Sequence, residues 1–317
     1  MLDDRIRMKQ DKRIAAEAKQ PMAGLWKSNS RLRSQLAAPL ETWRRLRRDK
    51  FAVIGGAVVV VVIALTLLAP VLPLADPIPK TLNTTGRLKP PFTPGYPLGA
   101  DELGRDVLSR MVWGARTSLL AGFLSAVISV AFGVAIGLIA GFRGGRVDDV
   151  IMRLTDILMA FPGVLLSIAI AAALGPGLRN AMIAVSITGI PLFVRVVRAS
   201  VLALREREFV LAAHTIGCSG PRIVLHHILP NVVAPVIVMG SLDVGNKIIA
   251  TASLSFLGLG TQPPAPDWGN MLASGRQFIS VAPHLATIPG IAIFVVVLGL
   301  NLLGDGLRDA LDPTLRQ

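Results

Sequence analysis

Long apolar runs separated by shorter charged stretches dominate the chain after residue 50. Six such blocks are visible, at residues 51–75, 117–142, 157–178, 180–198, 231–259 and 284–303. An α-helix rises 1.5 Å per residue, so about 20 apolar residues cross a hydrocarbon core about 30 Å thick. The pattern therefore predicts an all-α membrane protein with six transmembrane helices.

Residues inside two of these blocks predict how the helices pack. Gly133, Gly137 and Gly141 recur every four residues in the second block. Small residues at this spacing are typical of a seam where a neighbouring helix approaches closely. Pro162 lies inside the third block and predicts a kink there, which is tolerated where neighbouring helices surround it.

The two longest loops are predicted to lie outside the membrane. The first is rich in proline up to Pro97, which predicts irregular, extended backbone. Asp101 is then expected to cap an amphipathic helix that leads into the second span. In the second loop, Trp268 is expected to be an anchor at the membrane interface. That loop is either a simple connector or a contact for a docked external partner.

A charged stretch at residues 201–230 interrupts the apolar blocks and cannot lie in hydrocarbon. Its Ala, Leu, Arg and Glu residues favour a helix in the first half, and Gly217 stands where a left-handed C-cap would end it. Pro221 suits the first position of a second helix. We predict two helices joined by a sharp elbow at the membrane surface. The small Ala212 and Ala213 would let a partner's surface come close.

Composition and charge agree with a membrane protein and predict its orientation. The chain is 52% apolar and 17% charged, with a mean hydropathy of +0.59. Its net charge of +13 could suggest nucleic acid, but Lys and Arg also gather on the cytoplasmic side of membrane proteins. With the amino terminus inside, the inside segments hold 24 of the 33 Lys and Arg and the outside segments hold 8. We predict that both termini and the elbow are cytoplasmic, with no nucleic-acid partner.

No motif for catalysis, nucleotide binding or metal binding stands out. The chain has no P-loop sequence, and Gly258 and Gly260 do not continue into a dinucleotide fingerprint. Cys218 is the single cysteine, which excludes an internal disulfide and a Cys-based metal cluster. Adjacent His226 and His227 would point about 100° apart on a helix, a poor chelate. We expect no catalytic residue, metal or cofactor here, and an energy source on another subunit.

Two charged residues lie inside the fifth apolar block. Asp243 and Lys247 are four residues apart, with Asn246 beside them, and side chains at this spacing meet on one helix face. An unpaired charge at mid-membrane costs about 2.5–3.5 kcal/mol on insertion scales, so such residues pair or face a wet cavity. The hypothesis is that these three residues line a translocation path. The alternative is a structural pair buried between helices or near one interface.

Several long stretches resemble a known family. They are LGADELGRDVLSRMVWGARTSL, AAHTIG with HHILPN, ASLSFLGLGTQPPAPDWGNML and NLLGDGLRDALDP. Together they are similar to the C-type permease subunit of bacterial dipeptide and oligopeptide ABC importers, over nearly everything from residue 51 to 313. The resemblance implies the type I ABC importer permease fold and a location in the bacterial inner membrane.

The family pattern in the cytoplasmic loop is E-A-A, three residues, Gly, nine residues and I-x-L-P. The residues that match it are Ala212, Ala213, Gly217, Leu229 and Pro230. Leu211 stands at the Glu position and His227 at the Ile position. The resemblance implies that this loop is a coupling helix resting on an ATPase.

The apolar blocks and the distribution of Lys and Arg predict a division of the chain, and the resemblance implies a set of partners. The expected parts are a basic cytoplasmic segment (1–50), a first transmembrane helix (51–75), an extracytoplasmic loop with an amphipathic helix (76–116), a five-helix core that includes the coupling loop (117–304), and a cytoplasmic tail (305–317). The implied partners are a second, B-type permease, two cytoplasmic ATP-binding subunits and an extracytoplasmic solute-binding protein, with membrane lipid around the spans.

Three alternatives stay open from the sequence. The same type of complex could import glutathione or a nickel complex in place of dipeptides or oligopeptides. A secondary transporter could use Asp243 in ion or proton coupling. A membrane scaffold without transport would also be compatible with the glycine-rich seams.

Overall fold

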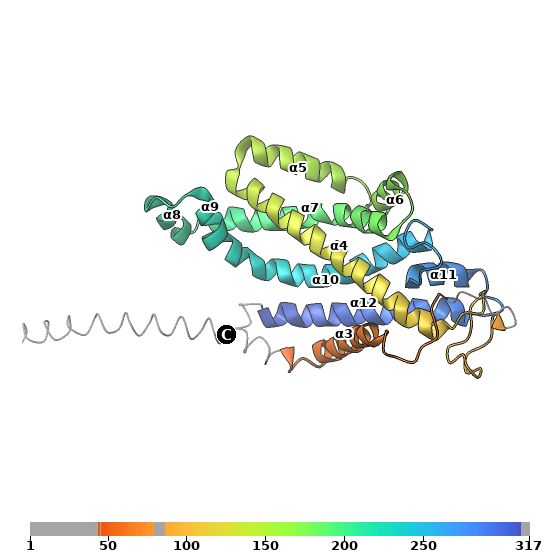
Figure 1. The fold of residues 1–317 in the computed structure, drawn as a ribbon. Helices are drawn as coiled ribbons and strands as arrows, with labels where there is room; N and C mark the ends of the chain where they lie inside the picture. Colours follow the sequence, from red (N-terminus) through yellow and green to blue (C-terminus); the bar gives the residue numbers. More distant parts are fainter. Residues whose placement is uncertain (1–43, 45, 79–85, 312–317) are drawn as a thin grey trace, which may run out of the picture.

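The structure is a computed structural model that describes residue 44 and the ranges 46–78 and 86–311. It is built from helices (Figure 1), and the described ranges contain no strand beyond two isolated bridges. In chain order the helices are α3 (Lys50–Leu68), α4 (Val107–Arg143), α5 (Gly145–Met159), α6 (Gly163–Leu174), α7 (Leu178–Arg205), α8 (Glu208–Thr215), α9 (Gly220–Ile223), the π-helix η2 (Val224–Ile228), α10 (Leu229–Phe256), α11 (Trp268–Arg276) and α12 (His284–Leu311). The all-α prediction is confirmed for this part of the chain.

Five helical stretches of the described chain are long and apolar enough to cross a membrane. They are α3, α4, α7, α12 and the continuous run from α9 through η2 to α10. A sixth span results if α5 and α6 together form one broken crossing. The predicted blocks locate these spans, but their ends differ. The first helix ends at Leu68, not near residue 75, and the last runs on to Leu311, not to residue 303.

The predicted glycine seam is confirmed between α4 and α7. A β-carbon added at Gly137 would lie 2.8 Å from Cβ of Val197, and one at Gly141 would lie 2.7 Å from Cβ of Val201. Both valines are fully buried. Real side chains do not approach so closely, so only glycine lets these two helices come together along this line.

The third apolar block is not one kinked helix. The chain forms α5 and α6, which meet at a bend of 92°. Pro162 precedes α6 as its N-cap residue and takes an extended ψ of 123°, which ends the helical path. The start of α5 at Gly145 was missed because its charged residues mask an amphipathic helix. At 1.5 Å per residue, α6 is only about 18 Å long, too short to cross alone.

The second span also begins differently from the prediction. Asp106, not Asp101, is the N-cap: its carboxylate accepts a hydrogen bond from the Ser109 N–H. Gly104 has a φ of +75°, which interrupts any helix starting at Asp101. There is therefore no separate amphipathic helix before the span, and α4 is one continuous helix of 37 residues.

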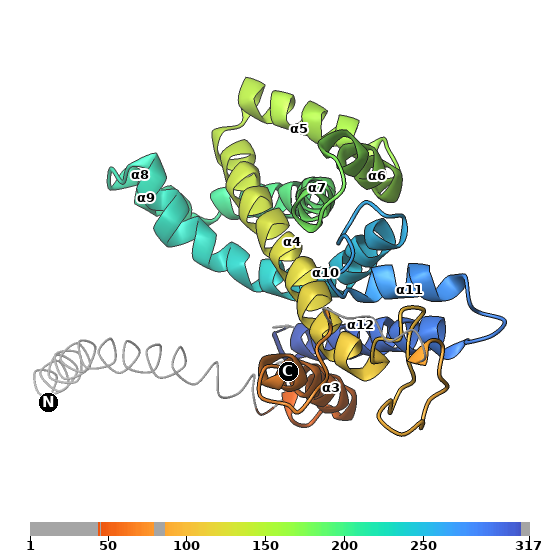
Figure 2. The same cartoon turned by 45° about the vertical axis from the view of Figure 1, so that its right-hand side comes forward.

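The helices place two groups of loops far apart. Figures 1 and 2 show α8 and α11 at opposite ends of the bundle. The start of α3 and the end of α12 lie toward the α8 end in Figure 1. The two candidate functional regions, the elbow around α8 and the loops around α11, therefore lie on opposite sides of the spans.

Candidate functional site

The predicted elbow is present, and two backbone hydrogen bonds close the end of α8. The Cys218 N–H donates to the Ala213 carbonyl, and the Gly217 N–H donates to the His214 carbonyl, each over 3.0 Å. These two bonds form the Schellman arrangement, which needs a left-handed residue after the helix. Gly217 supplies it with a φ of +82°. The sequence prediction of a glycine C-cap is confirmed.

The second arm of the elbow is the end of a transmembrane span. Ser219 is extended, and α9 starts at Gly220, which places Pro221 at the second helical position instead of the first. The helix then continues through η2 into α10 without a break. A turn of four residues, 216–219, therefore joins α8 to this span.

One face of α8 is fixed by packing against this end of the bundle. Val210 and Ala213 are 0% and 4% exposed and join a cluster with Val201, Ile223 and Ile228. The expectation that Ala213 faces a partner is therefore wrong, because this alanine is a packing residue. Ala212 alone of the two alanines is exposed.

The opposite face of α8 is open and largely apolar. We call it the α8 outer face and define it as Leu211, Ala212, Thr215 and Ile216. Leu211 is 53% exposed and Ile216 is 81% exposed. A β-carbon at Gly217 would touch nothing within 4 Å. Apolar side chains flank the small Ala212, an arrangement that suits a shallow groove on another protein.

Contacts that the sequence did not reveal tie the elbow to α4. The rings of His214 and Phe142 stack with centroids 6.3 Å apart. Nη1 of Arg205 donates to the Gly141 carbonyl over 3.4 Å. Leu229 packs against the buried cluster, whereas Pro230 is exposed. The residues that match the family pattern thus divide into an exposed set and a packing set.

The intramembrane charges of α10 lie inside the helix bundle. Nζ of Lys247 is 3.7 Å from Oδ2 of Asp243 and donates to the Val185 carbonyl of α7 over 3.0 Å. Asp243 is 7% exposed and Lys247 is 6% exposed. Asn246 is exposed and does not share their environment. The structure brings the first two predicted path residues together and separates the third.

The ammonium group of Lys247 occupies a niche between three helices. A β-carbon at Gly189 on α7 would collide with Nζ of Lys247, and it would also lie 2.6 Å from Oγ of Ser129 on α4. Ser129 in turn donates to the Ser186 carbonyl over 2.8 Å. Glycine is required at this position because the lysine fills the space of a side chain.

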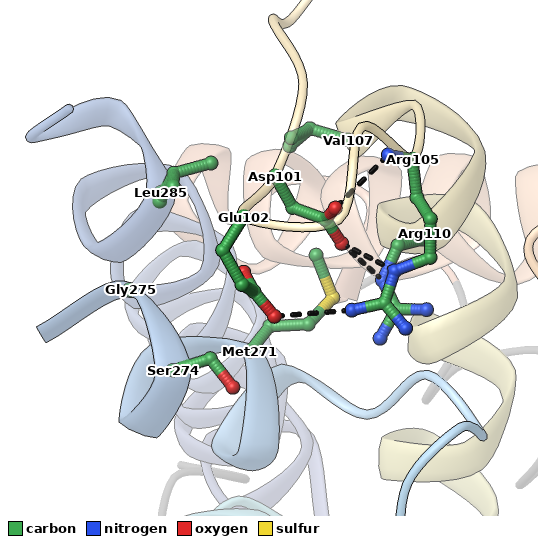
Figure 3. A pocket seen from close by; sticks show the side chains of 9 residues that line it. All are labelled: Asp101, Glu102, Arg105, Val107, Arg110, Met271, Ser274, Gly275 and Leu285. Atoms are coloured by element: carbon green, nitrogen blue, oxygen red, sulfur yellow. Dashed lines mark hydrogen bonds and ion pairs between the residues drawn. The ribbon is translucent and has the colours of Figure 1, made fainter. Parts of the chain in front are cut away.

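At the α11 end, charged residues form a compact ion-pair cluster that lines a small cavity (Figure 3). Oδ1 of Asp101 accepts hydrogen bonds from the backbone N–H groups of Leu103 and Arg105, both over 2.9 Å. Oδ2 of Asp101 lies 2.6 Å from Nε of Arg105 and 3.4 Å from Nε of Arg110. Asp101, Arg105 and Arg110 are all buried.

Arg110 connects this ion-pair cluster to two loops. Its Nη1 donates to the Pro77 carbonyl over 3.0 Å and to the Pro264 carbonyl over 3.3 Å. The proline-rich loop after α3 and the loop before α11 are therefore fastened to the first turn of α4. Such buried, multiply bonded charges serve as a structural clamp.

Asp267 and Trp268 complete this end of the molecule. Asp267 caps α11 by accepting from the Asn270 N–H over 3.2 Å, and it accepts from Oγ of Ser118 over 2.7 Å. Burial raises the pKa of the Asp267 carboxyl, although these hydrogen bonds act in the opposite direction. Trp268 is 2% exposed, and its Nε1 donates to the Met111 carbonyl over 3.0 Å. The predicted interfacial role of Trp268 is wrong because α11 turns the ring into the core.

Family models match most of this architecture. Residues 133–317 match the model described as "binding-protein-dependent transport system inner membrane component". Residues 40–91 match the model for the N-terminal transmembrane domain of oligopeptide transport permease C. The chain belongs to this transport family. Its members are the permease components of ABC importers, which work with another permease, ATP-binding subunits and a binding protein, and they reside in the bacterial inner membrane.

Relatives with curated names cover nearly the whole permease. A dipeptide transport system permease protein of Alkalihalophilus pseudofirmus is 46% identical over 87% of this chain and 90% of its own length. A glutathione transport system permease protein of Pectobacterium atrosepticum is 44% identical over 87% of this chain and 91% of its own length. A di/tripeptide transport system permease protein of Pseudomonas aeruginosa is also 44% identical, over 87% of this chain and 92% of its own length.

A solved structure supports the fold of the permease. The match is a chain of the MetNI methionine ABC transporter in an inward-facing conformation, with a TM-score of 0.52 and 17% identity. It covers 64% of this permease and 97% of that chain. The predicted ABC importer permease fold is therefore confirmed at the level of architecture. Within the described residues, no group of three or more His, Cys, Asp or Glu could hold a metal ion.

Proposed function

We propose that this permease imports dipeptides, as half of a heterodimer with a second, B-type permease. Two cytoplasmic ATP-binding subunits would sit against the α8 end, and an extracytoplasmic solute-binding protein would deliver the peptide at the α11 end. The dipeptide assignment is supported by the names of relatives at 42–46% identity. On this proposal both chain termini are cytoplasmic, as the distribution of Lys and Arg also indicates.

The observation that carries the mechanism is the construction of the elbow. One face of α8 is packed into the bundle through Val210 and Ala213, and the α8 outer face is free. The helix is joined through a closed C-cap to the continuous α9–η2–α10 rod. We infer that an ATPase groove holds the α8 outer face and that ATP-driven closure moves the rod. Ala212, Gly217 and Pro230 would be the exposed coupling residues, with Ala213 and Leu229 behind them.

Glutathione is the second candidate substrate, because relatives named as glutathione permeases are 44–45% identical to this chain. The test is uptake by the reconstituted complex of both permeases, both ATP-binding subunits and the binding protein. We expect ATP to drive uptake of a labelled dipeptide, with weak competition from glutathione. Stronger competition by glutathione would favour the second candidate, and uptake driven by an ion gradient without ATP would contradict an ABC importer.

The path hypothesis for Asp243, Asn246 and Lys247 stays a prediction. Burial of Asp243 and Lys247 favours the alternative of a structural pair, whereas the exposure of Asn246 leaves this side chain accessible to a solute. The double variant Asp243→Asn, Lys247→Met keeps the approximate size and removes both charges. Uptake at the wild-type rate by this variant, at normal expression, would end the path hypothesis for the pair.

A further inference from the structure

The break between α5 and α6 lies at hydrocarbon depth. Two contacts with α7 fix its level: Arg195 donates to Asp156 over 2.6 Å on one side, and Oγ of Ser167 lies 3.0 Å from Oγ1 of Thr188 on the other. With the membrane boundary placed at Arg179, at the far end of α7, this interval lies about 14–24 Å deep at 1.5 Å per residue. The hydrocarbon core is about 30 Å thick, so the bend falls well inside it.

The backbone at the break is irregular, exposed and incompletely bonded. Residues 159–165 are all exposed. Pro162 offers no side-chain cap to α6, and the first recorded bond is from the Leu166 N–H to the Pro162 carbonyl over 3.0 Å. Within the described ranges, the N–H groups of Gly163, Val164 and Leu165 precede the first bonded turn of α6 and have no hydrogen-bond partner in the chain.

Hydrocarbon offers no hydrogen-bond acceptor to the free N–H groups at the break. Non-helical backbone at membrane depth is tolerated only where other protein buries it or where it lines a water-filled cavity. In the continuous helix α3, by contrast, the backbone is bonded along its length and apolar side chains such as Val60, 65% exposed, can face lipid. Exposed residues of α3 can therefore contact lipid, whereas the exposed backbone at the break requires water or another protein beside it.

A second observation indicates water on the same side of the molecule. The Asp156 and Arg195 side chains next to the break are 57% and 46% exposed. Intramembrane charges face bundle interiors or aqueous cavities, not lipid. A neighbouring pair, Asp148 with Arg198, extends this polar strip toward the α8 end. The strip alternates charges of both signs, and the break adds free amide groups and apolar side chains.

We propose that the α5–α6 break, residues 160–165, lines the aqueous translocation path of the permease. The wall suits small zwitterionic peptides, because it combines a neutralised charge pair with free backbone donors and the apolar side chains of Phe161, Val164 and Leu165. The proposal rests on the proposed permease function, since only a transporter needs such a path. It assigns the path to this break and not to the buried pair in α10.

Single-cysteine labelling tests the proposal, and the chain is convenient because Cys218 is its one cysteine. In a Cys218→Ser parent, Val164→Cys is compared with Val60→Cys, two valines of similar exposure at 60% and 65%. Phe161→Cys is a second site in case one variant fails to assemble. Each is studied in the assembled complex in membrane vesicles, with a charged methanethiosulfonate reagent that reacts with the water-exposed thiolate.

We expect Val164→Cys to react at least about tenfold faster than Val60→Cys, because the thiolate forms only where water reaches it. Trapping the ATPases with vanadate should change the rate at Val164→Cys and not at Val60→Cys. Equal slow rates at both sites, or a fast rate that ignores the nucleotide state, would overturn the proposal. So would a photo-crosslinker at residue 164 that captures the second permease in both states.

Failure of this inference can be separated from failure of the proposed function. ATP-driven dipeptide uptake is measured with the unsubstituted complex, independently of labelling, and is compared with uptake by the Cys218→Ser parent, because the Cys218 N–H belongs to the elbow cap. A parent that imports peptide while residue 164 stays dry contradicts only the path assignment. An unsubstituted complex that imports no peptide while residue 164 labels in a nucleotide-dependent way contradicts only the substrate.

Discussion

The two ends of the permease are built in opposite ways. At the α11 end, Asp101, Arg105 and Arg110 are buried together, and Arg110 is bonded to the loop after α3 and the loop before α11. At the α8 end, one helix of eight residues is held by a single packed face and a glycine cap, and its other face is bare. The first end is held by contacts within the chain, whereas the second leaves an apolar helix face uncovered.

This difference separates stability from function. Changes in the ion-pair cluster at the α11 end should lower the stability of the permease before they affect coupling. Changes on the α8 outer face should leave the fold intact and uncouple the permease from the ATP-binding subunits.

The largest effect is expected from Asp101→Ala. The substitution leaves Arg105 and Arg110 buried without their carboxylate, and breaking a buried charge pair in this way costs about 3–5 kcal/mol. Denaturant unfolding of the purified complex in detergent would measure the loss. Glu102→Ala is the matched control: this carboxylate is more exposed, and its ion pair is with Arg105 over 3.2 Å. A loss of about 0–1 kcal/mol is expected there, and equal losses in both variants would contradict the clamp.

Gly217→Asp should abolish most ATP-driven uptake while membrane insertion persists. The position is left-handed, where a side chain costs about 1–2 kcal/mol, and the new carboxylate would sit at the elbow beside the α8 outer face. Uptake in vesicles and the amount of inserted protein are measured together. Gly145→Asp is the control, because Gly145 is also left-handed and a β-carbon there meets nothing within 4 Å. Normal uptake in Gly217→Asp would contradict a tightly docked elbow.

Ile216→Asp should weaken the hold of the ATP-binding subunits without altering the stability of the permease. This side chain is 81% exposed, so the fold loses little. Burying an isoleucine in a partner's groove contributes about 1.5–3 kcal/mol, equivalent to at least a tenfold change in affinity. Co-purification and ATPase stimulation would report it. Leu211→Glu adds a charge on the same face but restores the family's residue, and it should be tolerated. Equal loss in both variants would argue against a specific groove.

Much of this comparison could be predicted from sequence because local signals specified it. Apolar length located the spans, and the glycine repeat at Gly133, Gly137 and Gly141 located the seam with α7. The elbow followed from one glycine after a helix-favouring stretch. These features depend on neighbouring residues or on a single helix face, which are visible in the order of the amino acids.

The misplaced residues depended on distant contacts. Trp268 looked like an interfacial anchor, but the position of α4 gave its Nε1 a carbonyl partner in the core. Asp101 looked like a helix cap, but Gly104 at a φ of +75° interrupts the turn after it, and its carboxylate pairs with Arg105 and Arg110. Ala213 lies on the covered side of α8 because the neighbours that bury it come from elsewhere in the sequence. A pattern identifies the faces of a helix, whereas tertiary packing decides which face is covered.

The smallest predicted effect concerns the pH dependence of stability at the α11 end. Burial raises the pKa of Asp267 above its ordinary value of 3.8, so the folded state favours the protonated form. The stabilisation is therefore present below pH 3.8 and is lost as the pH rises through the raised pKa. Asp267→Asn keeps an oxygen that can accept from Ser118 and from the first turn of α11, without the buried charge.

The unfolding free energy of the wild type should therefore fall over this pH range, whereas that of Asp267→Asn should not show this fall. Unfolding by denaturant at a series of pH values would measure the difference between the two curves. Asp76→Asn is the control for removal of a capping carboxylate, because Asp76 accepts from the Ile78 N–H over 2.8 Å at an exposed position. If the curves for wild type and Asp267→Asn are parallel, ionisation of Asp267 does not affect the stability of the α11 end. The buried charge would then play no part in the difference between the two ends.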